Sequence, residues 1–362
     1  MDDTAPGTPV LQELHALARA AAHPEGAKTC PCPVALLADR DDGTVVRHGP
    51  LVLKAHAPRT AAGSGDTSGA RSGDRSGQGA ADGDLDARIA VAALPALAGV
   101  LLPPLPGAAL PHVPLPGTCP PDASSPPRAR TAVLGDRPLT LWPYGIPVDP
   151  DAPEAAPWEA AARLLALLHR TPAPPGLPAM RAPLKAALAV DRMRRAAPGH
   201  PATATVLRAW RTLPEEYPAS ATDRLCHGDF HLGQLVRAPH WRLIDVDDLG
   251  LGDPAWDLAR PAAWFAAGLL APEVWARFLG AYEAAGGPAT GRRPGDAGSG
   301  DENHGGGGEG NGGDPWARLD VPARALTVQT AALALAKSTA EGRPLDEVEN
   351  VMIDTCARIV AL

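Results

Sequence analysis

The sequence predicts an α+β fold with two lobes, a small β-rich N-terminal lobe over residues 1–148 and a larger α-helical C-terminal lobe over residues 149–362. The length of 362 residues exceeds one typical domain and falls short of three. Short β-branched or Leu-rich runs separated by turn residues dominate the first part of the chain. From Pro157 onward, the apolar residues recur with helical spacing instead.

The N-terminal lobe is predicted from two groups of strands. The stretch from Val34 to Ala57, "VALLADRDDGTVVRHGPLVLKAHA", indicates three strands with breaks at "DRDDG" and "HGP". Lys54, one of four Lys in the chain, falls inside the third strand. The stretch "LDARIAVAALPAL" predicts a helix that begins near Asp84 or Asp86. A further hairpin follows in "RTAVLGDRPLTLWPYGIPV", with its turn at "LGDRP".

The C-terminal lobe is predicted from a series of helical patterns. The first, "PWEAAARLLALLHR", is apolar nearly all round and is expected to lie inside the lobe, with Pro157 at a position that tolerates a missing N–H. Further helices are predicted at "PLKAALAVDRMRRAA", "PATATVLRAWRTL", "PEVWARFLGAYEAAG", "PARALTVQTAALALAKSTAEG" and "LDEVENVMIDTCARIVAL". A β-rich lobe followed by an α-rich lobe is the order of elements in protein-kinase-like folds.

Two low-complexity tracts interrupt the chain, at residues 61–84 and at residues 286–315. They contain almost nothing that can be buried, so the entropy of the chain predicts that both are disordered insertions. Both are rich in Gly, but neither contains the GxxxxGK[ST] pattern that cradles phosphates in a P-loop.

Charge and hydropathy restrict the possible partners and the location. The net charge is -8 and no run of Lys or Arg is present, which argues against nucleic acid and anionic membranes as partners and favours a neutral or cationic small molecule. No apolar span reaches 18 residues, and the acidic start "MDDTAPGTPVLQEL" differs from a signal peptide, so the protein is expected to be cytoplasmic. The sequence leaves the oligomeric state open.

Five cysteines are present, and no two of them form a C-x-x-C pair. Cys30 and Cys32 stand in "CPCP", whereas Cys119, Cys226 and Cys356 are scattered. Reduced structural thiols are therefore expected, in preference to a disulfide framework or a metal site.

The stretch "LCHGDFHLGQLV", Leu225 to Val236, carries the most chemistry. Asp229 and Gln234 have the spacing D-x-x-x-x-Q, and kinase catalytic loops use D-x-x-x-x-N, in which the Asp receives the hydroxyl proton and the amide oxygen binds Mg²⁺. Downstream, "LVRAPHWRLIDVDD" predicts a hairpin that returns Asp245 to the side of this loop. A carboxylate at this place can hold Mg²⁺ against ATP phosphates.

These residues resemble the aminoglycoside phosphotransferase family, which includes choline, homoserine and several sugar kinases. The resemblance rests on "HGDFHLGQL", "LIDVDDLGLGDPAWDLA", "LLALLHR" and, more loosely, "LVLKAHA". It implies a bilobal protein-kinase-like fold and ATP-dependent phosphorylation of a small-molecule hydroxyl. It further implies that Asp229 is the catalytic base, Gln234 and Asp245 are the Mg²⁺ ligands, and Lys54 contacts the nucleotide phosphates. The wording "HGDxHLGQ" is especially similar to maltokinases and related glucosamine kinases, so the expected acceptor is a sugar, an amino sugar or an aminoglycoside.

The sequence departs from the family pattern at two places. The family usually has Asn where Gln234 stands, although the sugar-kinase branch has Gln. The Glu expected to pair with Lys54 is missing from "DLDARIAVAAL", where only Asp84 and Asp86 are available. These departures keep a catalytically silent nucleotide-binding module as an alternative.

Several of these residues also have a structural interpretation. Lys54 can be an edge-strand Lys that guards against aggregation. His227 and His231 are expected to be hydrogen-bonding scaffolds of the loop rather than metal ligands. Asp253, before Pro254, is placed as a helix N-cap. The resemblance implies that the Asp in "WDLA", residue 257, braces the catalytic loop.

A metallophosphatase is a further, less favoured alternative, because "GDFH" resembles the GDxH opening of that class. Such a site needs downstream Asn-His and His-x-His groups, and the chain offers only Asn303-His304 inside a Gly-rich tract. The acceptor itself is not fixed by the sequence. Gln329 and Lys337 are isolated polar residues in an apolar helix that can touch sugar hydroxyls, and the acids of the C-terminal helices can bind amines, although charges on helices usually form a solvated face.

Overall fold

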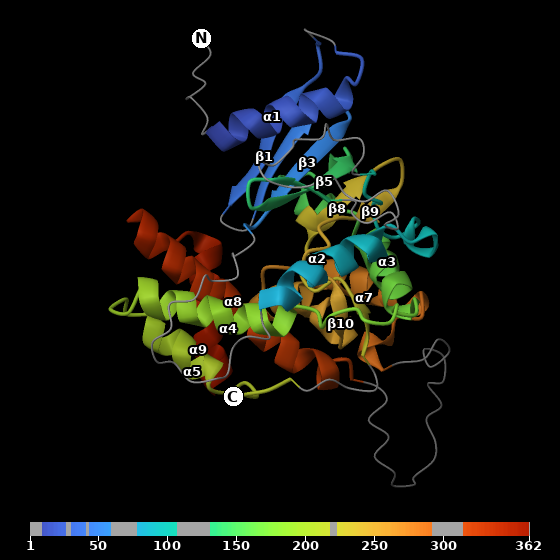
Figure 1. The fold of residues 1–362 in the computed structure, drawn as a ribbon. Coiled ribbons are helices and arrows are strands. Elements are labelled where there is room, and N and C mark those ends of the chain that lie inside the picture. The colour runs from blue at the N-terminus through green and yellow to red at the C-terminus, as the bar shows by residue number, and fades with distance from the viewer. Residues whose placement is uncertain are drawn as a thin grey trace. The chain divides into compact units, whose positions relative to one another are not determined.

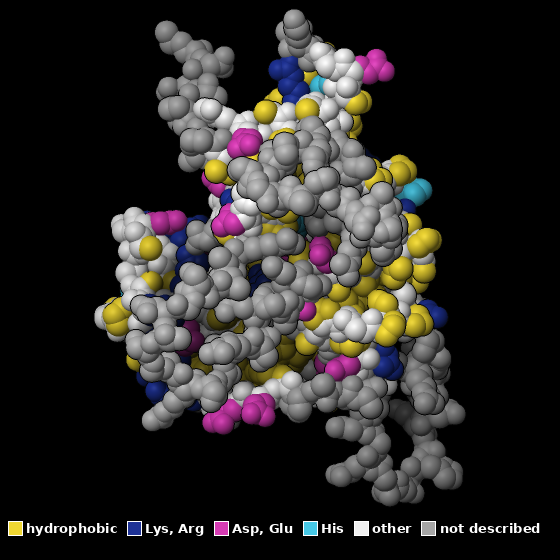
Figure 2. Space-filling view, in the orientation of Figure 1, with side chains coloured by type: hydrophobic (Ala, Val, Ile, Leu, Met, Phe, Trp, Pro, Cys, Tyr) yellow, Lys and Arg dark blue, Asp and Glu magenta, His cyan; other side chains and the backbone are white. Residues whose placement is uncertain are grey.

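The computed structural model describes residues 9–26, 30–40, 43–58, 78–106, 131–217, 223–291 and 314–361 (Figure 1). The chain divides into two compact units. The first comprises Met1–Ile146 and Arg237–Arg242, and the second comprises Pro147–Val236 and Leu243–Leu362. On the face drawn in Figure 2, acidic and basic side chains are interspersed with one another and with hydrophobic side chains.

An antiparallel five-stranded sheet in the order β1-β2-β3-β5-β4 forms the centre of the first unit. Its strands are β1 (Val34–Arg40), β2 (Gly43–His48), β3 (Leu51–His56), β4 (Thr131–Leu134) and β5 (Arg137–Pro143). The predicted strands and both predicted hairpins are present. Because β3 is the central strand, the interpretation of Lys54 as an edge-strand residue is wrong: Lys54 pairs with Val45 on one side and with Thr140 on the other.

Helix α1 (Pro9–Ala22) lies across this sheet (Figure 1). Its buried side chains Leu14, Leu17 and Ala18 recur at helical spacing. Together with buried side chains of the sheet they form one core cluster. No helix was predicted for these residues. The core cluster under α1 consists of Leu14, Leu17, Ala18, Val46, Leu53, Ala55, Leu139 and Leu141.

Helix α2 (Gln78–Ala92) and the 3-10 helix η1 (Pro95–Leu97) also belong to this unit. Since α2 begins at Gln78, residues 78–84 are helical, which corrects the end of the disordered insertion predicted over residues 61–84. The rest of that tract, up to residue 77, lies outside the described residues. Asp84 lies 3.9 Å from the guanidinium of Arg88, one turn further along α2.

The second unit is built from helices. They are α3 (Trp158–Arg170), α4 (Ala182–Ala196), α5 (Thr203–Trp210), α6 (Ala259–Ala267), α7 (Pro272–Ala284), α8 (Trp316–Glu341) and α9 (Glu347–Ala361). Short 3-10 helices η3 (Pro153–Ala155), η4 (Leu232–Gln234), η5 (Pro254–Trp256) and η6 (Pro288–Thr290) connect them. Among the described residues, none of the helices is long and apolar enough to cross a membrane.

The long helix α8 is central to the core of this unit, and it packs on α4, α6 and α9. It begins at Trp316, six residues before the predicted start at Pro322. Trp316 stacks on Phe265 and tilts against Trp275, and these aromatic contacts hold the extra turns in place.

The second predicted insertion, residues 286–315, also begins too early. Residues 288–290 form η6, in which Ala289 is fully buried and Thr290 is 6% exposed. Burial of these short side chains orders the start of the tract. Residues 292–313 lie outside the described part of the chain.

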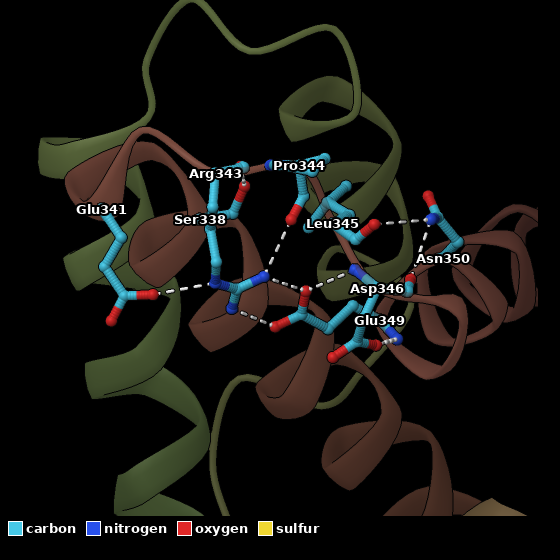
Figure 3. A network of polar contacts seen from close by, with 8 residues as sticks. All are labelled: Ser338, Glu341, Arg343, Pro344, Leu345, Asp346, Glu349 and Asn350. Carbon is cyan, nitrogen blue, oxygen red and sulfur yellow. Dashed lines mark hydrogen bonds and ion pairs between the residues drawn. The ribbon is translucent and has the colours of Figure 1, made fainter.

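A capping network closes the N-terminus of α9 (Figure 3). The Asp346 carboxylate accepts the Glu349 amide at 2.8 Å, and the Glu349 carboxylate accepts the Asp346 amide at 2.9 Å. Arg343 donates two further bonds of 2.7 Å to Glu349 and one of 2.8 Å to Glu341. These acids are therefore engaged in capping and ion pairs, as expected for the solvated face of a helix.

Short strands flank the loop that contains Asp229 and the segment that contains Asp245. Strand β7 (Arg224–Cys226) pairs with β10 (Gly250–Gly252), and β6 (Ile146–Pro147), β8 (Leu235–Arg237) and β9 (Trp241–Leu243) form a three-stranded sheet in the order β6-β8-β9. The chain between β7 and β8 contains the "HGDFHLGQ" motif, and the chain between β9 and β10 contains Asp245.

Candidate functional site

The main chain that precedes Asp229 is fixed by a buried carboxylate. Asp257 Oδ2 accepts hydrogen bonds from the His227 amide at 2.6 Å and from His169 Nε2 at 2.9 Å, and Oδ1 accepts the Gly228 amide at 2.8 Å. Asp257 is 1% exposed and His169 is fully buried. These bonds brace the loop, as the resemblance implied for residue 257.

Tyr282 completes this network from helix α7. Its hydroxyl is 2.7 Å from His169 Nδ1 and accepts the Ala289 amide at 3.0 Å, so it holds the imidazole with Nε2 directed at Asp257. Burial alone raises the pKa of Asp257, but the hydrogen bonds from His169 and from the His227 amide outweigh burial and lower it. The carboxylate under the loop therefore stays ionised.

Asp229 lies between two cations. Its Oδ2 is 2.7 Å from Lys185 Nζ, on α4, and its Oδ1 is 3.2 Å from Arg260 Nη2, on α6. Burial raises the pKa of Asp229, but Lys185 and then Arg260 outweigh burial and hold it below the ordinary value. Asp229 is therefore a carboxylate at neutral pH, with lone pairs left over for a further hydrogen bond.

Lys185 bridges Asp229 to another carboxylate. Its ammonium is 2.7 Å from Asp248 Oδ2 as well, and burial, which lowers the pKa of Lys185, is outweighed by Asp229 and Asp248. The pKa of Asp248 is raised, mainly by burial, and Lys185 offsets that only in part. The ammonium thus screens two neighbouring negative charges from each other.

Gly228 permits the close approach of these segments. It has φ +81°, and a Cβ there would overlap the carbonyl oxygen of Asp248. Only Gly combines this backbone conformation with such a short distance between two segments of the chain.

Gln234 and Asp245 lie side by side, as the predicted hairpin requires. Gln234 Nε2 donates to Asp245 Oδ2 at 3.2 Å, and the Ile244 amide donates to the Gln234 carbonyl at 3.0 Å. His227 Nε2 donates to the Ile244 carbonyl at 2.8 Å, so His227 acts as a scaffold of the hairpin. His231 has the same kind of role, because its Nδ1 accepts the Gly233 amide and caps η4.

Asp245 has φ +62°, the only positive φ of a non-glycine residue among those the structure describes. Such backbone strain persists where the surroundings impose it, and it clusters at functional sites. A carboxylate and an amide oxygen are hard ligands suited to Mg²⁺. The Gln234–Asp245 pair therefore fits a Mg²⁺ ion once the Gln234 amide turns its oxygen toward Asp245.

A small pocket lies beside Asp229. Its polar lining is Lys185, Asp229, Arg260 and Gln329, and its apolar lining includes Phe230, Trp256 and Leu326. Gln329 thus lines the pocket, and its contact with a substrate stays a prediction. Lys337 is exposed near the C-terminal end of α8.

The sequence did not predict three members of the site, Lys185, Arg260 and Asp248. Lys185 is one of four Lys in the chain and stands between apolar residues of α4, which was the available signal. Arg260 follows Asp257 by three residues and carried no comparable signal. Lys54 belongs to the other unit, and its contact with nucleotide phosphates stays a prediction. Asp253 caps the 3-10 helix η5, with Pro254 at its first position, as expected.

The fold is similar to that of several solved kinases. A choline kinase from Cryptosporidium parvum Iowa II is 9% identical, with a TM-score of 0.51 over 97% of this chain and 95% of that chain. A choline/ethanolamine kinase family protein from Mesorhizobium loti is 16% identical (TM-score 0.48, 97% and 94% covered), and a macrolide 2'-phosphotransferase from Brachybacterium faecium is 14% identical (TM-score 0.45, 96% and 98% covered). The likeness to the choline kinase structure confirms the predicted α+β protein-kinase-like fold.

Sequence comparison supplies the family. No curated protein matches the chain. The family model described as "Phosphotransferase enzyme family" matches residues 110–297, just over half of the chain, and this range includes the "HGDFHLGQ" loop, Asp245 and Asp257. The match confirms the predicted small-molecule phosphotransferase and leaves no support for a metallophosphatase. This chain belongs to the phosphotransferase enzyme family.

Proposed function

We propose that the protein transfers the γ-phosphoryl group of Mg-ATP to a hydroxyl of a sugar, an amino sugar or an aminoglycoside. The observation that carries the proposal is the pocket in which ionised Asp229 stands beside Lys185, Arg260 and Gln329. The N-terminal unit is the proposed nucleotide-binding lobe, and the C-terminal unit is the proposed catalytic and acceptor lobe.

Asp229 is the proposed base for the acceptor hydroxyl. A carboxylate with a lowered pKa is a weak base in the ground state, so Asp229 first accepts a hydrogen bond and orients the hydroxyl. The hydroxyl becomes acidic as its oxygen bonds to phosphorus, and Asp229 then accepts the proton. Lys185 and Arg260 flank the same carboxylate, and they can stabilise the negative charge of the transferring phosphoryl group.

Gln234 and Asp245 are the proposed Mg²⁺ ligands, and Lys54 is the proposed phosphate contact. Bound Mg²⁺ neutralises charge on the ATP phosphates and aligns them. The observed support is the adjacency of the two side chains and the strained backbone of Asp245. Lys54 stands on the central strand of its sheet, a position well suited to a fixed cation.

The pocket favours an acceptor with several hydroxyl groups. Gln329, which lines the pocket, offers both a hydrogen-bond donor and an acceptor. Lys185 and Arg260 repel an amine beside Asp229. An amino sugar or aminoglycoside is therefore expected to bind with its amines directed away from these two cations.

Two matched substitutions test the site. Asp229→Asn is expected to lower turnover about 10²- to 10⁴-fold, the usual range for a general base, and to leave the binding of Mg²⁺ with a non-hydrolysable ATP analogue unchanged. Asp245→Asn is expected to weaken that binding in titration calorimetry as well as turnover. Asp191→Asn, in an exposed ion pair of α4, serves as the control and is expected to change neither quantity.

The acceptor is tested with a panel of glucosamine, maltose, aminoglycosides, choline and homoserine in a coupled assay of ADP formation. The proposal requires acceptor-dependent ADP formation with at least one hydroxyl-rich compound. Turnover of choline or homoserine alone would refute the acceptor class. Full turnover by Asp229→Asn would refute the catalytic assignment, and nucleotide binding without any transfer would favour a silent binding module.

A further inference from the structure

A second group of chemically reactive side chains lies in the N-terminal unit. His23 follows α1, Cys30 and Cys32 precede β1, and His48 ends β2. One ligand atom from each residue lies within 4.8 Å of all the others. Three separate segments of the chain therefore deliver two thiols and two imidazoles to one point.

The distances within this group match a zinc coordination shell. Cys30 Sγ is 3.2 Å from His48 Nε2, and Cys32 Sγ is 3.5 Å from His23 Nε2. With Zn–S near 2.3 Å and Zn–N near 2.05 Å, a tetrahedron places sulfur and nitrogen ligands about 3.6 Å apart. The two imidazole rings stand at 86° to each other, with centroids 5.3 Å apart, so they present Nε2 atoms from different directions.

We propose that His23, Cys30, Cys32 and His48 bind one Zn²⁺ ion in a closed tetrahedral site. Thiolate and imidazole ligands together select zinc over the hard cations Mg²⁺ and Ca²⁺. All four positions are taken by protein atoms, so the ion has a structural role and offers no open position to a substrate. Binding converts both thiols to thiolates and releases two protons, and the resulting centre carries no net charge.

The backbone around the cysteines is built for close packing. The Gly49 amide donates to the Pro33 carbonyl at 2.8 Å, and a Cβ on Gly49 would lie 3.2 Å from Cys32 Sγ. Gly49 also has φ +58°, so the turn after His48 depends on Gly in order to reach the cysteine segment. The approach of Cys32 to the end of β2 is thus fixed by the main chain.

The ion joins elements that share only a small core. The buried cluster under α1 contains eight residues, all aliphatic. Small cores are commonly supplemented by a structural metal. Zinc at this place ties the end of α1 and the segment before the edge strand β1 to the end of β2.

Another group with metal-ligand chemistry, in the second unit, behaves differently. His169, Cys226 and Asp257 are buried within 4.8 Å of one another. Asp257 already accepts three hydrogen bonds, and the Cys226 thiol donates to the Gly252 carbonyl at 3.3 Å. These bonds account for that group, so the zinc proposal applies to the first group alone.

The test is the metal content of the full-length protein after expression with added zinc and desalting. Mass spectrometry of the metals is expected to find about one zinc per chain. Replacement by Co²⁺ is expected to give the intense absorption of thiolate-to-cobalt charge transfer. Cys30→Ser with Cys32→Ser is expected to lose the zinc and the absorption, whereas Cys119→Ser and His240→Ala are expected to keep both.

The wild-type measurements decide the proposal even if the double variant fails to fold. A purified wild-type chain with under about one tenth of a zinc ion, and without a thiolate band in Co²⁺, would overturn it. Retention of full zinc by a folded Cys30→Ser, Cys32→Ser chain would overturn it too. A disulfide between Cys30 and Cys32 in the zinc-supplemented protein would assign the thiols to redox chemistry and reject the metal site.

Discussion

Replacement of Lys185 by Met removes the cation that separates two carboxylates. Lys185 Nζ is 2.7 Å from Asp229 and 2.7 Å from Asp248, and the three side chains are 27%, 23% and 15% exposed. Removing one partner of a fully buried ion pair costs about 3–5 kcal/mol, and an exposed pair contributes about 0–1 kcal/mol. For these partly buried side chains we expect a loss of about 2 kcal/mol in the free energy of unfolding at pH 8.

The loss must depend on pH. Without Lys185, the folded-state pKa values of both carboxylates rise, because each then faces the other's charge. An acid whose pKa is raised in the folded state takes up protons on folding. Stability therefore falls as pH rises from the ordinary pKa of 3.8 through the raised pKa of the folded state. We therefore expect the variant to be closer to wild type at pH 5 than at pH 8.

Urea denaturation followed by Trp fluorescence at the two pH values measures both quantities. Lys337→Met, which removes an exposed Lys from the same unit, is the matched control and is expected to stay within about 0.5 kcal/mol of wild type. Adding Asp248→Asn to Lys185→Met is expected to recover about 1 kcal/mol, because it removes one of the facing charges. Equal stability of Lys185→Met and wild type at pH 8, or no recovery in the double variant, would refute the reasoning.

Three further stability predictions use the same denaturation assay. Gly228→Ala is expected to lower the free energy of unfolding by more than about 2 kcal/mol, because φ is +81° and the added Cβ meets the Asp248 carbonyl. The control Gly280→Ala, on the open surface of α7, is expected to stabilise by about 0.5–1 kcal/mol. Equal effects of the two substitutions would contradict the close approach at Gly228. Asp346→Ala is expected to cost about 1 kcal/mol through loss of the α9 cap, and an unchanged stability would contradict the capping role. Mainly hydrogen bonds from Arg343 lower the pKa of Glu349 to about 2. The contribution of Glu349 to stability is therefore present above pH 4.5 and is expected to be lost as pH falls toward 2. A stability difference between wild type and Glu349→Gln that stays constant across this pH range would contradict the prediction.

Local sequence patterns predicted the order of the elements and the polar loop. Strand runs, helical periodicity and turn residues are local signals, so the sheet strands and helices α3 to α5, α7 and α9 lie close to their predicted positions. The hairpin that returns Asp245 to Gln234 was predictable for the same reason, because its two strands are separated by a short turn. Predicted helix boundaries were less accurate where packing with distant residues sets them. One example is the start of α8 at Trp316, which Phe265 and Trp275 hold in the helix.

Contacts between residues far apart in the sequence depend on tertiary packing. Lys185 reaches Asp229 across 44 positions of sequence, since packing places α4 against the loop. The cysteines were interpreted as isolated thiols, because C-x-C lacks the usual metal-site spacing and neither His23 nor His48 is marked as a partner by the sequence. Local patterns specify the conformation of a segment, whereas the meeting of distant segments depends on how the sheet and the helices bury their apolar faces. Such meetings form both the pocket at Asp229 and the cluster at Cys30.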